Sequence, residues 1–399
     1  MTVTVRRLGP EATAASQRLT QEAFGVPPAG GPAEPDELAA PGFHWWGAVD
    51  GDRLVAQAVD REFDGWFGGR VLPVAGIADV TVAVEERGAG VLAPLLQELL
   101  LAARERGAVV STLWATAPHI YRRTGYEVVA ATRVVEVPSA VLGAVRAQGD
   151  VRLRRAEVRD VERVRWLYDA WASGLDGALT RRGVSFPETD EQLLARFTGI
   201  TLAEDPDGRP LGYAAWVRGR GDGSGPELSV PDLVATHVDA YAALVRALAS
   251  FGSVASTVRL RTTGDDLVRL LVPSLAWTPV RDELYSLKVL DVERAFTSAR
   301  CAPGLSARLG FRVAGDVLPD VNGTYVLEAE GGAVRCERGR SAPGDDRALS
   351  PRGLALLVTG ARPCRDLRTL GLLVGGDPAQ DATWDAVVAG RVPGVLDHF

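Results

Sequence analysis

Residues 76–92 read GIADVTVAVEERGAGVL and join an apolar strand to a helix through a glycine-bearing turn. Val80, Val82 and Val84 occupy alternate positions, as the apolar side chains of a half-buried strand do. The turn, RGAG at residues 87–90, contains two glycines, which allow the backbone to come close to a ligand. The segment therefore predicts a strand, a tight turn and a helix in that order.

Helical spacing begins at Val91, in the stretch VLAPLLQELLLAARERG. Its leucines recur three or four residues apart, which is typical of one face of an amphipathic helix. The first amide N–H groups of such a helix have no intrahelical acceptor and point into the preceding turn. We therefore expect an anion, such as a pyrophosphate, to bind at the turn. An ordinary strand–helix connection is the alternative.

The composition indicates a globular protein of two or three domains. The chain has 399 residues, of which 46% are hydrophobic and 24% charged, and both fractions are typical of globular chains. No apolar run approaches the roughly 20 residues of a membrane span, and the N-terminal residues lack the apolar core of a signal peptide. We therefore expect a cytoplasmic protein without a membrane partner.

Charge and metal-ligating residues narrow the function further. The net charge of −7 argues against a nucleic-acid partner and favours a cationic substrate. The cysteines lack the close spacing of a zinc site or a disulfide framework, so buried thiols and no metal are expected. The four histidines are equally scattered. These residues are Cys301, Cys336 and Cys364, and His44, His119, His237 and His398.

A domain-sized repeat is visible in the chain. Residues 2–25 and residues 150–174 both read as a strand, a polar turn and a helix that ends at a glycine. The second copy has no Arg-x-x-Gly turn between its later strand and the helix that follows. From residue 302 the pattern changes to alternating strands with turns at Asn322-Gly323 and Gly331-Gly332, followed by helical stretches. This last unit is expected to be an antiparallel sheet packed with helices. Residues 25–42, rich in Pro and Gly, predict a lid over a site or a disordered loop.

A second motif, IYRRTGY at residues 120–126, follows the turn. Together, the Arg-x-x-Gly turn and this Tyr-x-x-x-Gly-Tyr segment resemble the signatures of the GNAT superfamily of N-acetyltransferases, although Leu92 stands where the superfamily has a small residue. In that superfamily the first aromatic protonates the departing thiolate. A tyrosine suits this role, because its pKa of about 10 keeps it protonated at neutral pH and lies close to that of a thiol. The alternative is that both tyrosines are core residues.

Over essentially the whole chain, the order of units resembles the enhanced intracellular survival (Eis) family of acetyltransferases. The resemblance implies an α+β fold with tandem GNAT units, each a mixed twisted sheet with flanking helices, and a last domain similar to a sterol carrier protein. The expected domains are an active GNAT domain (1–148), a degenerate GNAT-like domain (149–288) and the carrier-like domain (289–399). A homohexamer is also implied.

The same resemblance implies acetyl-CoA as the cosubstrate and assigns residues to it. Tyr121 becomes the general acid, and the carboxylate of Phe399 becomes the base, since the apolar ending GVLDHF predicts a docked terminus. The carboxylate is a poor base unless burial raises its pKa or the amine's own pKa is depressed. The residues expected to hold acetyl-CoA are Val80, Val82, Arg87, Gly88, Gly90, Val91 and Thr116.

Acidic and aromatic residues indicate the acceptor. Asp79 interrupts the apolar strand where the family has an apolar or aromatic residue, so it is either an outward-facing strand residue or a carboxylate beside the acceptor amine. We expect Phe24, Asp36, Trp45, Asp79 and Asp397 to bind a cationic amine of the aminoglycoside or polyamine type, an activity that would confer antibiotic resistance. Two alternatives remain: acylation of a peptide amine or a specific antibiotic or metabolite intermediate, and non-catalytic binding of acyl-CoA or lipid.

Overall fold

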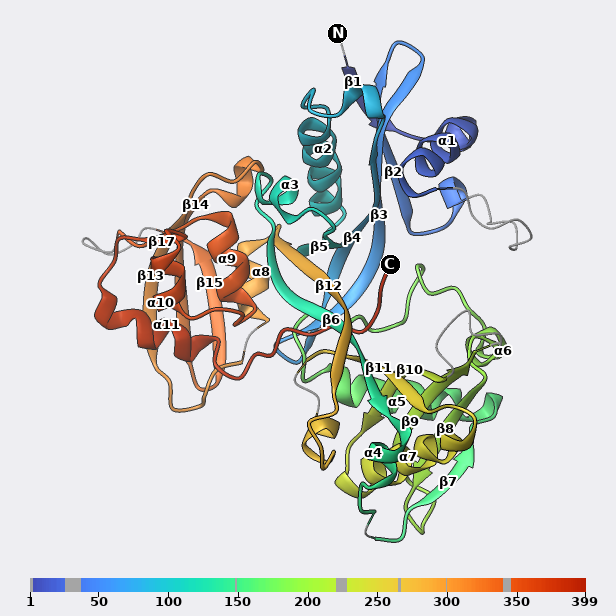
Figure 1. The fold of residues 1–399 in the computed structure, drawn as a ribbon. Coiled ribbons are helices and arrows are strands. Elements are labelled where there is room, and N and C mark those ends of the chain that lie inside the picture. Colours follow the sequence, from blue (N-terminus) through green and yellow to red (C-terminus); the bar gives the residue numbers. More distant parts are fainter. Residues whose placement is uncertain are drawn as a thin grey trace.

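The computed structural model describes residues 3–25, 37–147, 149–219, 228–264, 267–298, 300–339 and 346–399. Along the chain these residues form three successive units, coloured blue to cyan, green to yellow and orange to red in Figure 1. Within the described residues, a 12-stranded sheet runs through the first two units, and a separate five-stranded sheet forms the third. The tandem repeat expected from the sequence is therefore one continuous sheet.

The first unit begins with helix α1, which ends where Gly25 adopts a φ of 88°. Helix α2 buries its leucine face against the sheet, as its spacing predicts, and Leu95 and Leu99 are fully buried. The elements of this unit are β1 (Val3–Arg7), α1 (Thr13–Phe24), β2 (Phe43–Asp50), β3 (Arg53–Phe67), β4 (Arg70–Val82), α2 (Leu92–Glu105), β5 (Val110–Trp114), α3 (Pro118–Arg122), β6 (Glu127–Pro138) and α4 (Ser139–Gly143).

The second unit repeats this order of strands and helices, but its central connection is shorter. Only Thr236 and His237 separate strand β10 from helix α7, whereas residues 83–91 separate β4 from α2. The Arg-x-x-Gly turn is thus absent from the second unit, as the sequence indicates. The elements are β7 (Arg152–Arg155), α5 (Val161–Ala172), α6 (Asp190–Ala195), β8 (Gly199–Glu204), β9 (Pro210–Arg218), β10 (Leu228–Ala235), α7 (Val238–Ala249), β11 (Thr257–Thr262) and β12 (Thr278–Val289).

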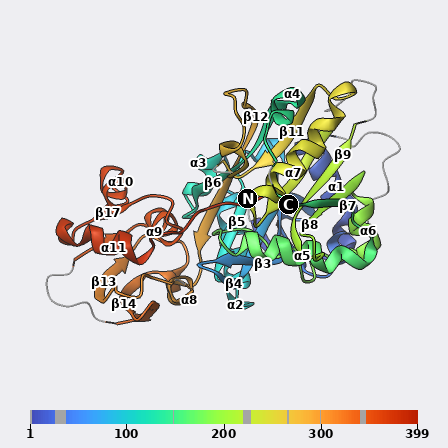
Figure 2. The same ribbon diagram turned by 90° about the horizontal axis from the view of Figure 1, so that it is seen from below.

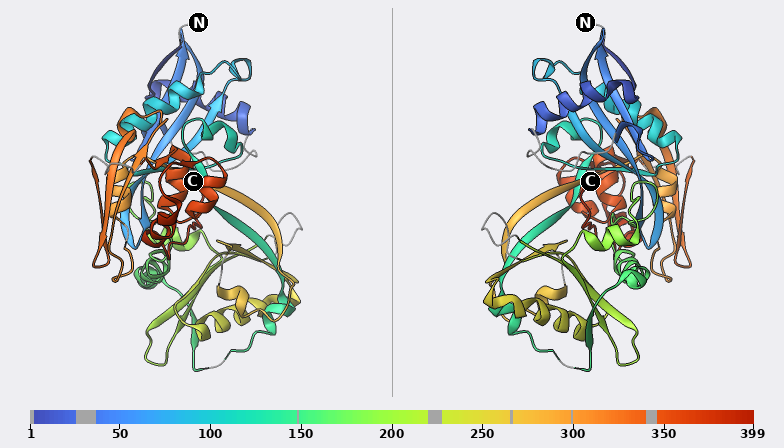
Figure 3. Two further views of the ribbon diagram at one scale, coloured as in Figure 1. Left: turned by 90° about the vertical axis from the view of Figure 1, so that its left-hand side faces the viewer. Right: turned by 90° about the vertical axis from the view of Figure 1, so that its right-hand side faces the viewer.

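Two strands are exchanged between these units. Strand β12, the last of the second unit, pairs with β5 and β6 of the first, and β6 pairs in turn with β11 of the second. Figure 3 shows β6 and β12 arching together from the upper unit to the lower one. Each unit therefore completes the sheet of the other. The domain boundaries expected between residues 148 and 149 and between residues 288 and 289 stay predictions.

The third unit lies to one side of the long sheet (Figure 2). Its sheet has the order β15-β14-β13-β16-β17. The prediction of an antiparallel sheet was wrong for one pair of strands, because β13 and β16 are parallel. Strands β14 and β15 lie between them in the chain. The elements are α8 (Val292–Thr297), β13 (Ala307–Val313), β14 (Gly323–Glu330), β15 (Ala333–Arg338), β16 (Ala348–Leu349), α9 (Pro351–Val358), α10 (Cys364–Thr369), β17 (Leu373–Val374) and α11 (Asp381–Val387).

The two predicted turns of the third unit have different outcomes. Gly331 and Gly332, with φ of 57° and 83°, form the hairpin between β14 and β15 as expected. Asn322 and Gly323 do not form a tight hairpin turn, because residues 314–322 connect β13 to β14. The side-chain nitrogen Nδ2 of Asn322 donates to the backbone carbonyl oxygens of Asp316 and Leu318. Its side-chain oxygen Oδ1 accepts from the backbone N–H of Asp316 at 2.9 Å. The side chain therefore braces a longer loop between β13 and β14.

The remaining expectations concern cysteines, metals and membranes. All three cysteines are free and buried, as predicted. Among the described residues, no group of three or more His, Cys, Asp or Glu side chains is arranged to hold a metal ion. Within the same part of the chain, no helix combines the length and apolar character needed to cross a membrane.

A buried ion pair joins the third unit to the exchanged strand. Lys288 of β12 and Asp316 of the third unit are almost completely buried, with Nζ and Oδ2 2.5 Å apart. Burial lowers the pKa of the Lys288 amino group, while the charge of Asp316 opposes that change. A charge left unpaired at such a depth carries a large desolvation cost.

We predict that Lys288→Met lowers the free energy of unfolding by about 3–5 kcal/mol, because it leaves the Asp316 carboxylate buried without its partner. The double variant Lys288→Met/Asp316→Asn removes both charges and recovers more than half of the loss. Urea and thermal denaturation measure both effects. Equal stability of the single and double variants would contradict an energetic coupling between the two groups.

Candidate active site

A fork between two parallel strands forms the centre of the candidate site. β4 and β5 pair only from Val74 with Val110 to Ile77 with Leu113. Beyond this point β4 continues to Val82 beside β3, while β5 ends at Trp114. Past Ile77 the described residues of β4 and β5 no longer pair with each other, so this stretch of β4 can offer backbone groups to a ligand.

A β-bulge bends β4 at the mouth of the fork. Asp79 and Val80 together oppose the single residue Ala58 of β3, and Asp79 has a φ of 48°. Aspartate tolerates this left-handed region better than most residues do, and an extra residue of this kind bends a strand. Asp79, the charged residue that interrupts the apolar pattern, therefore lies at the bulge. The hypothesis that its carboxylate lies beside the acceptor amine stays a prediction.

The glycine turn after β4 is open. Gly88 and Gly90 have φ values of 85° and 81°, and a side chain added at either would meet no atom within 4 Å. Among the described residues, no hydrogen-bond acceptor faces the amides of these glycines. Arg87 is exposed, and its Nε donates to the Val82 carbonyl at 3.3 Å. Helix α2 starts immediately afterwards, so its positive N-terminus faces this turn.

Tyr121 lies on helix α3, which follows β5. Its side chain is largely buried and meets the ring of Tyr126 edge-on, with centroids 6.2 Å apart. Burial raises the pKa of the Tyr121 hydroxyl, so it is protonated across the neutral range. Tyr126 is fully buried, and its hydroxyl lies 2.6 Å from Ser111 Oγ, beneath the fork. Tyr126 is thus a core residue, as the sequence indicates.

The support behind Tyr121 comes from the third unit and was missed by the sequence reasoning. Glu127 pairs with Arg122 of α3 at 2.9 Å and with Arg352 of α9 at 2.6 Å. Although burial opposes it, hydrogen bonding from these guanidinium groups lowers the pKa of the Glu127 carboxyl. The carboxylate therefore ties α3 to the third unit, and a local sequence pattern carries no signal for such a contact.

The C-terminal residues are docked, as predicted. The ring of Phe399 packs on Phe63 with centroids 4.8 Å apart, and it lies so close to Gly76 that a side chain there would come within 2.8 Å of it. His398 stacks on Trp114 at the end of β5, with centroids 5.0 Å apart. The last two residues therefore lie at the fork, against both of its strands.

The other predicted residues are dispersed. Thr116 is exposed between β5 and α3, and Val91 is buried at the start of α2. Trp45 is buried with Leu8, Ala12 and Val59 beneath α1, while Phe24 at the end of α1 is 62% exposed. Asp36 and most of the predicted lid lie outside the described residues. Both oxygens of Asp397 are engaged by Tyr168 and Arg181, at 2.8 and 2.7 Å.

Family profiles match each unit of the chain. Profiles of an acetyltransferase (GNAT) domain match residues 4–129 and 177–287, and a profile of the sterol carrier protein domain matches residues 292–395. The fold class expected from the sequence is confirmed: two tandem GNAT units precede a sterol-carrier-like unit.

Relatives cover the whole chain. An uncharacterised N-acetyltransferase from Streptomyces griseus is 30% identical across 100% of both chains. The structure of a GCN5-related N-acetyltransferase from Kribbella flavida is 29% identical over 100% of this chain and 98% of its own, with a TM-score of 0.85. Eis1 from Mycobacterium abscessus shares the fold at 22% identity and a TM-score of 0.77, over 100% of both chains.

The bulge gives a direct test of Asp79. We expect Asp79→Val to destabilise the protein by about 1–3 kcal/mol, because a β-branched residue is strained at a positive φ. Asp79→Asn keeps the turn geometry and removes the charge, so it serves as the matched control and retains stability. Thermal unfolding measures both. Equal melting temperatures would mean that the positive φ imposes no cost.

Proposed function

The chain belongs to the GNAT family of N-acetyltransferases, and we propose that it transfers the acetyl group of acetyl-CoA to the amine of a cationic small molecule. GNAT acetyltransferases use acetyl-CoA as cosubstrate, so the first step of this proposal follows from the family. The site residues, the acceptor class and a specific relationship to the Eis family are our proposals. The open fork between β4 and β5, next to the glycine turn, is the observation that carries the proposed acetyl-CoA site.

We assign the cosubstrate to the fork and the turn. The amides of Gly88, Gly90 and Val91 and the side chain of Arg87 would hold the pyrophosphate, since glycines without side chains let an anion reach the backbone. The unpaired edge of β4 at Val80 and Val82 would bond the pantetheine arm. Thr116, beyond the end of β5, completes the set. The openness around both glycines supports this assignment.

The chemistry divides between two residues. The acceptor nitrogen attacks the thioester carbonyl, the carbon–sulfur bond breaks, and Tyr121 donates its proton to the departing thiolate. The carboxylate of Phe399 takes or directs the proton lost by the amine. Amide groups along the β4 edge stabilise the oxyanion between these steps. The largely buried Tyr121 side chain and the docked ring of Phe399 support these roles.

A cationic acceptor of the aminoglycoside or polyamine type is supported by charge and position. Asp79 lies at the bulge, one residue before Val80, and the chain carries a net charge of −7. Phe24, Asp36 and Trp45 are proposed as further acceptor contacts. The rival acceptors, a peptide amine or a specific antibiotic or metabolite intermediate, fit the same fork and are distinguished by the assay below.

We also propose that the protein assembles from copies of itself, as a hexamer. The connection between β11 and β12 exposes large apolar side chains, with Leu270 82% and Leu275 99% exposed. Exposed apolar side chains on one connection support an interface between copies if they form one contiguous surface. Mass determination by light scattering tests the assembly.

The decisive experiment follows thiol release with aminoglycosides, polyamines, peptides and aryl amines as acceptors. We expect turnover with multiply charged amines and, in Tyr121→Phe, a kcat lowered by about 100-fold or more with the KM for acetyl-CoA nearly unchanged. Tyr126→Phe is the matched control, because it removes a core hydroxyl near the same ring. No turnover with any amine would overturn the function in favour of acyl-CoA or lipid binding.

The carboxylate role of Phe399 has its own test. We expect a Gly-Ser extension after Phe399 to lower kcat far more than it weakens acetyl-CoA binding, because the carboxylate would be replaced by a neutral amide. Titration calorimetry measures the binding and thiol release measures kcat. An unchanged kcat would remove the carboxylate from the reaction.

A further inference from the structure

The second unit contains a fork like that of the first. β10 and β11 are parallel neighbours only from Leu228 with Val258 to Val230 with Leu260, after which β10 continues beside β9 and β11 beside β6. β10 also carries a bulge, where Val230 and Pro231 oppose the single residue Trp216. The geometry of the active fork is thus repeated, although the short connection to α7 leaves no glycine turn to hold a pyrophosphate.

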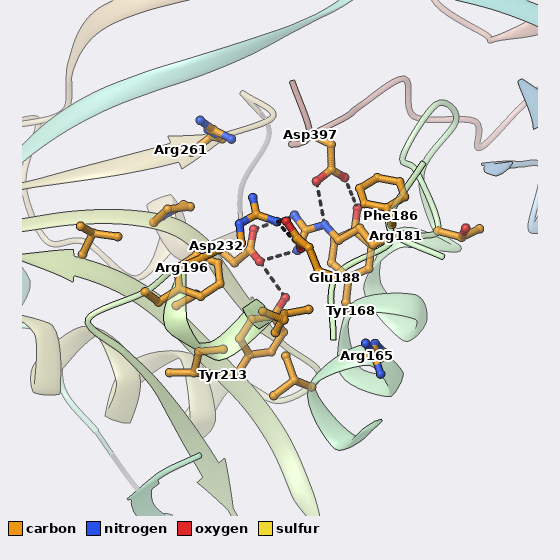
Figure 4. A pocket seen from close by; sticks show the side chains of 18 residues that line it. Arg165, Tyr168, Arg181, Phe186, Glu188, Arg196, Tyr213, Asp232, Arg261 and Asp397 are labelled. Carbon is orange, nitrogen blue, oxygen red and sulfur yellow. Dashed lines mark hydrogen bonds and ion pairs between the residues drawn. The ribbon is translucent and has the colours of Figure 1, made fainter. Parts of the chain in front are cut away.

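The C-terminal segment of the same chain lies beside this second fork, and its Asp397 lines the same cavity as Pro231, Asp232 and Arg261. Arg261 of β11 donates to the carbonyl of Leu396 at 3.0 Å, and Thr132 of β6 donates to that of Val395 at 2.6 Å. Val395 and Leu396 are buried. The next residue, Asp397, points into a cavity of about 250 Å³ beside β9 and β10 (Figure 4).

Arg181 connects the fork to this segment. Its guanidinium makes two bonds to Asp232 of β10, at 2.5 and 2.8 Å, and one to Asp397 at 2.7 Å. It also lies over the ring of Tyr168, 3.8 Å from the centroid, and the Tyr168 hydroxyl bonds the other oxygen of Asp397 (Figure 4). Both Asp397 oxygens therefore point at donors of the second unit.

The backbone at Arg181 is held in an unusual conformation. Its φ is 55°, a left-handed conformation that is costly for a residue with a Cβ atom. The preceding residue, Thr180, donates its amide to the carbonyl of Asp64 on β3, so this backbone is fixed to the first unit. Such strain persists only where the surroundings compensate for it, and here the guanidinium has two carboxylate partners.

The C-terminal segment then continues directly to the fork between β4 and β5 of the first unit. Only His398 separates Asp397 from Phe399. The ring of Phe399 rests on Gly76 of β4, and His398 stacks on Trp114 of β5. Residues 395–399 thus connect the fork of the second unit to the fork of the first. The position of Phe399 depends on where Asp397 is held.

We propose that the fork of the second GNAT unit is a binding site for the chain's own C-terminal segment, and that Arg181 and Tyr168 are positioning residues for Phe399. The second unit has lost its cofactor turn and kept the fork, which now takes a peptide carboxylate as its ligand. In this assignment Asp397 anchors the segment and does not contact the acceptor. Segment binding is independent of the proposed function, whereas its effect on turnover rests on it.

Hydrogen exchange of the C-terminal peptide tests the binding. Tyr168→Phe keeps the ring beneath Arg181 and removes the hydroxyl from Asp397, so we expect exchange of the amides in residues 395–399 to accelerate about tenfold. Tyr213→Phe is the matched control. It removes a buried tyrosine hydroxyl from Asp232 of the same network, 3.0 Å away, without touching the segment, and should leave the exchange within about twofold of wild type.

Asp397→Asn provides a second variant, at a residue that lies outside the core of the second unit. It should accelerate exchange as Tyr168→Phe does. The exchange rate of the double variant should exceed that of the faster single variant only slightly, because both substitutions act on the same contact between Tyr168 and Asp397. Unchanged exchange in both single variants, or equal acceleration in Tyr213→Phe, would overturn the proposal.

Kinetics separate the two claims. If the anchored segment positions Phe399, Tyr168→Phe lowers kcat while the KM for acetyl-CoA stays within about twofold of wild type. Faster exchange with an unchanged kcat would overturn the positioning role and leave the binding site intact. A wild-type protein that fails to acetylate any amine would overturn the proposed function, while the exchange data would still decide whether the segment is bound.

Discussion

The separation of two parallel neighbours within one sheet is the constraint on which the rest of this structure depends. A β-ladder satisfies backbone groups only while its strands stay side by side. β4 leaves β5 after Ile77, and β10 leaves β11 after Val230. Each separation exposes strand edges that need other partners. In the first unit we assign those partners to acetyl-CoA, and beside the second separation Arg261 and Arg181 contact the end of the chain.

The two forks are kept in a fixed relationship by shared strands. β12 of the second unit pairs with β5 and β6 of the first, and β6 of the first pairs with β11 and β12 of the second, so neither unit has a complete sheet alone. The third unit is joined to the same strands, through Lys288 with Asp316 and through Glu127 with Arg352. Buried ion pairs of this kind are costly to separate. A movement of the third unit relative to the long sheet would therefore have to break them. A C-terminal segment that spans both forks is therefore held between well-fixed surfaces.

This arrangement changes the meaning of the degenerate copy. Its missing turn removes the means of holding a pyrophosphate, since α7 starts almost directly after β10. Its bulge and fork persist, and so do the buried groups around Arg181. A unit that looks chemically silent in sequence thus presents a site of its own, and its ligand is encoded in the last residues of the same chain.

The sequence by itself determined the local elements, because strand alternation, helical spacing and glycine turns act over a few residues. It predicted the strand, turn and helix of residues 76–92, the repeat, the missing second turn and the docked Phe399. Only the tertiary structure decided the strand exchange, the role of Asn322 as a loop brace, and the contacts of Arg181, Glu127 and Asp397. Those contacts join residues far apart in the chain, and no local pattern encodes which distant carboxylate a guanidinium meets. The glycine that opens the decisive stretch, Gly76, illustrates the difference: the sequence shows a small residue in a strand, and the fold shows the aromatic rings of Phe63 and Phe399 that require it.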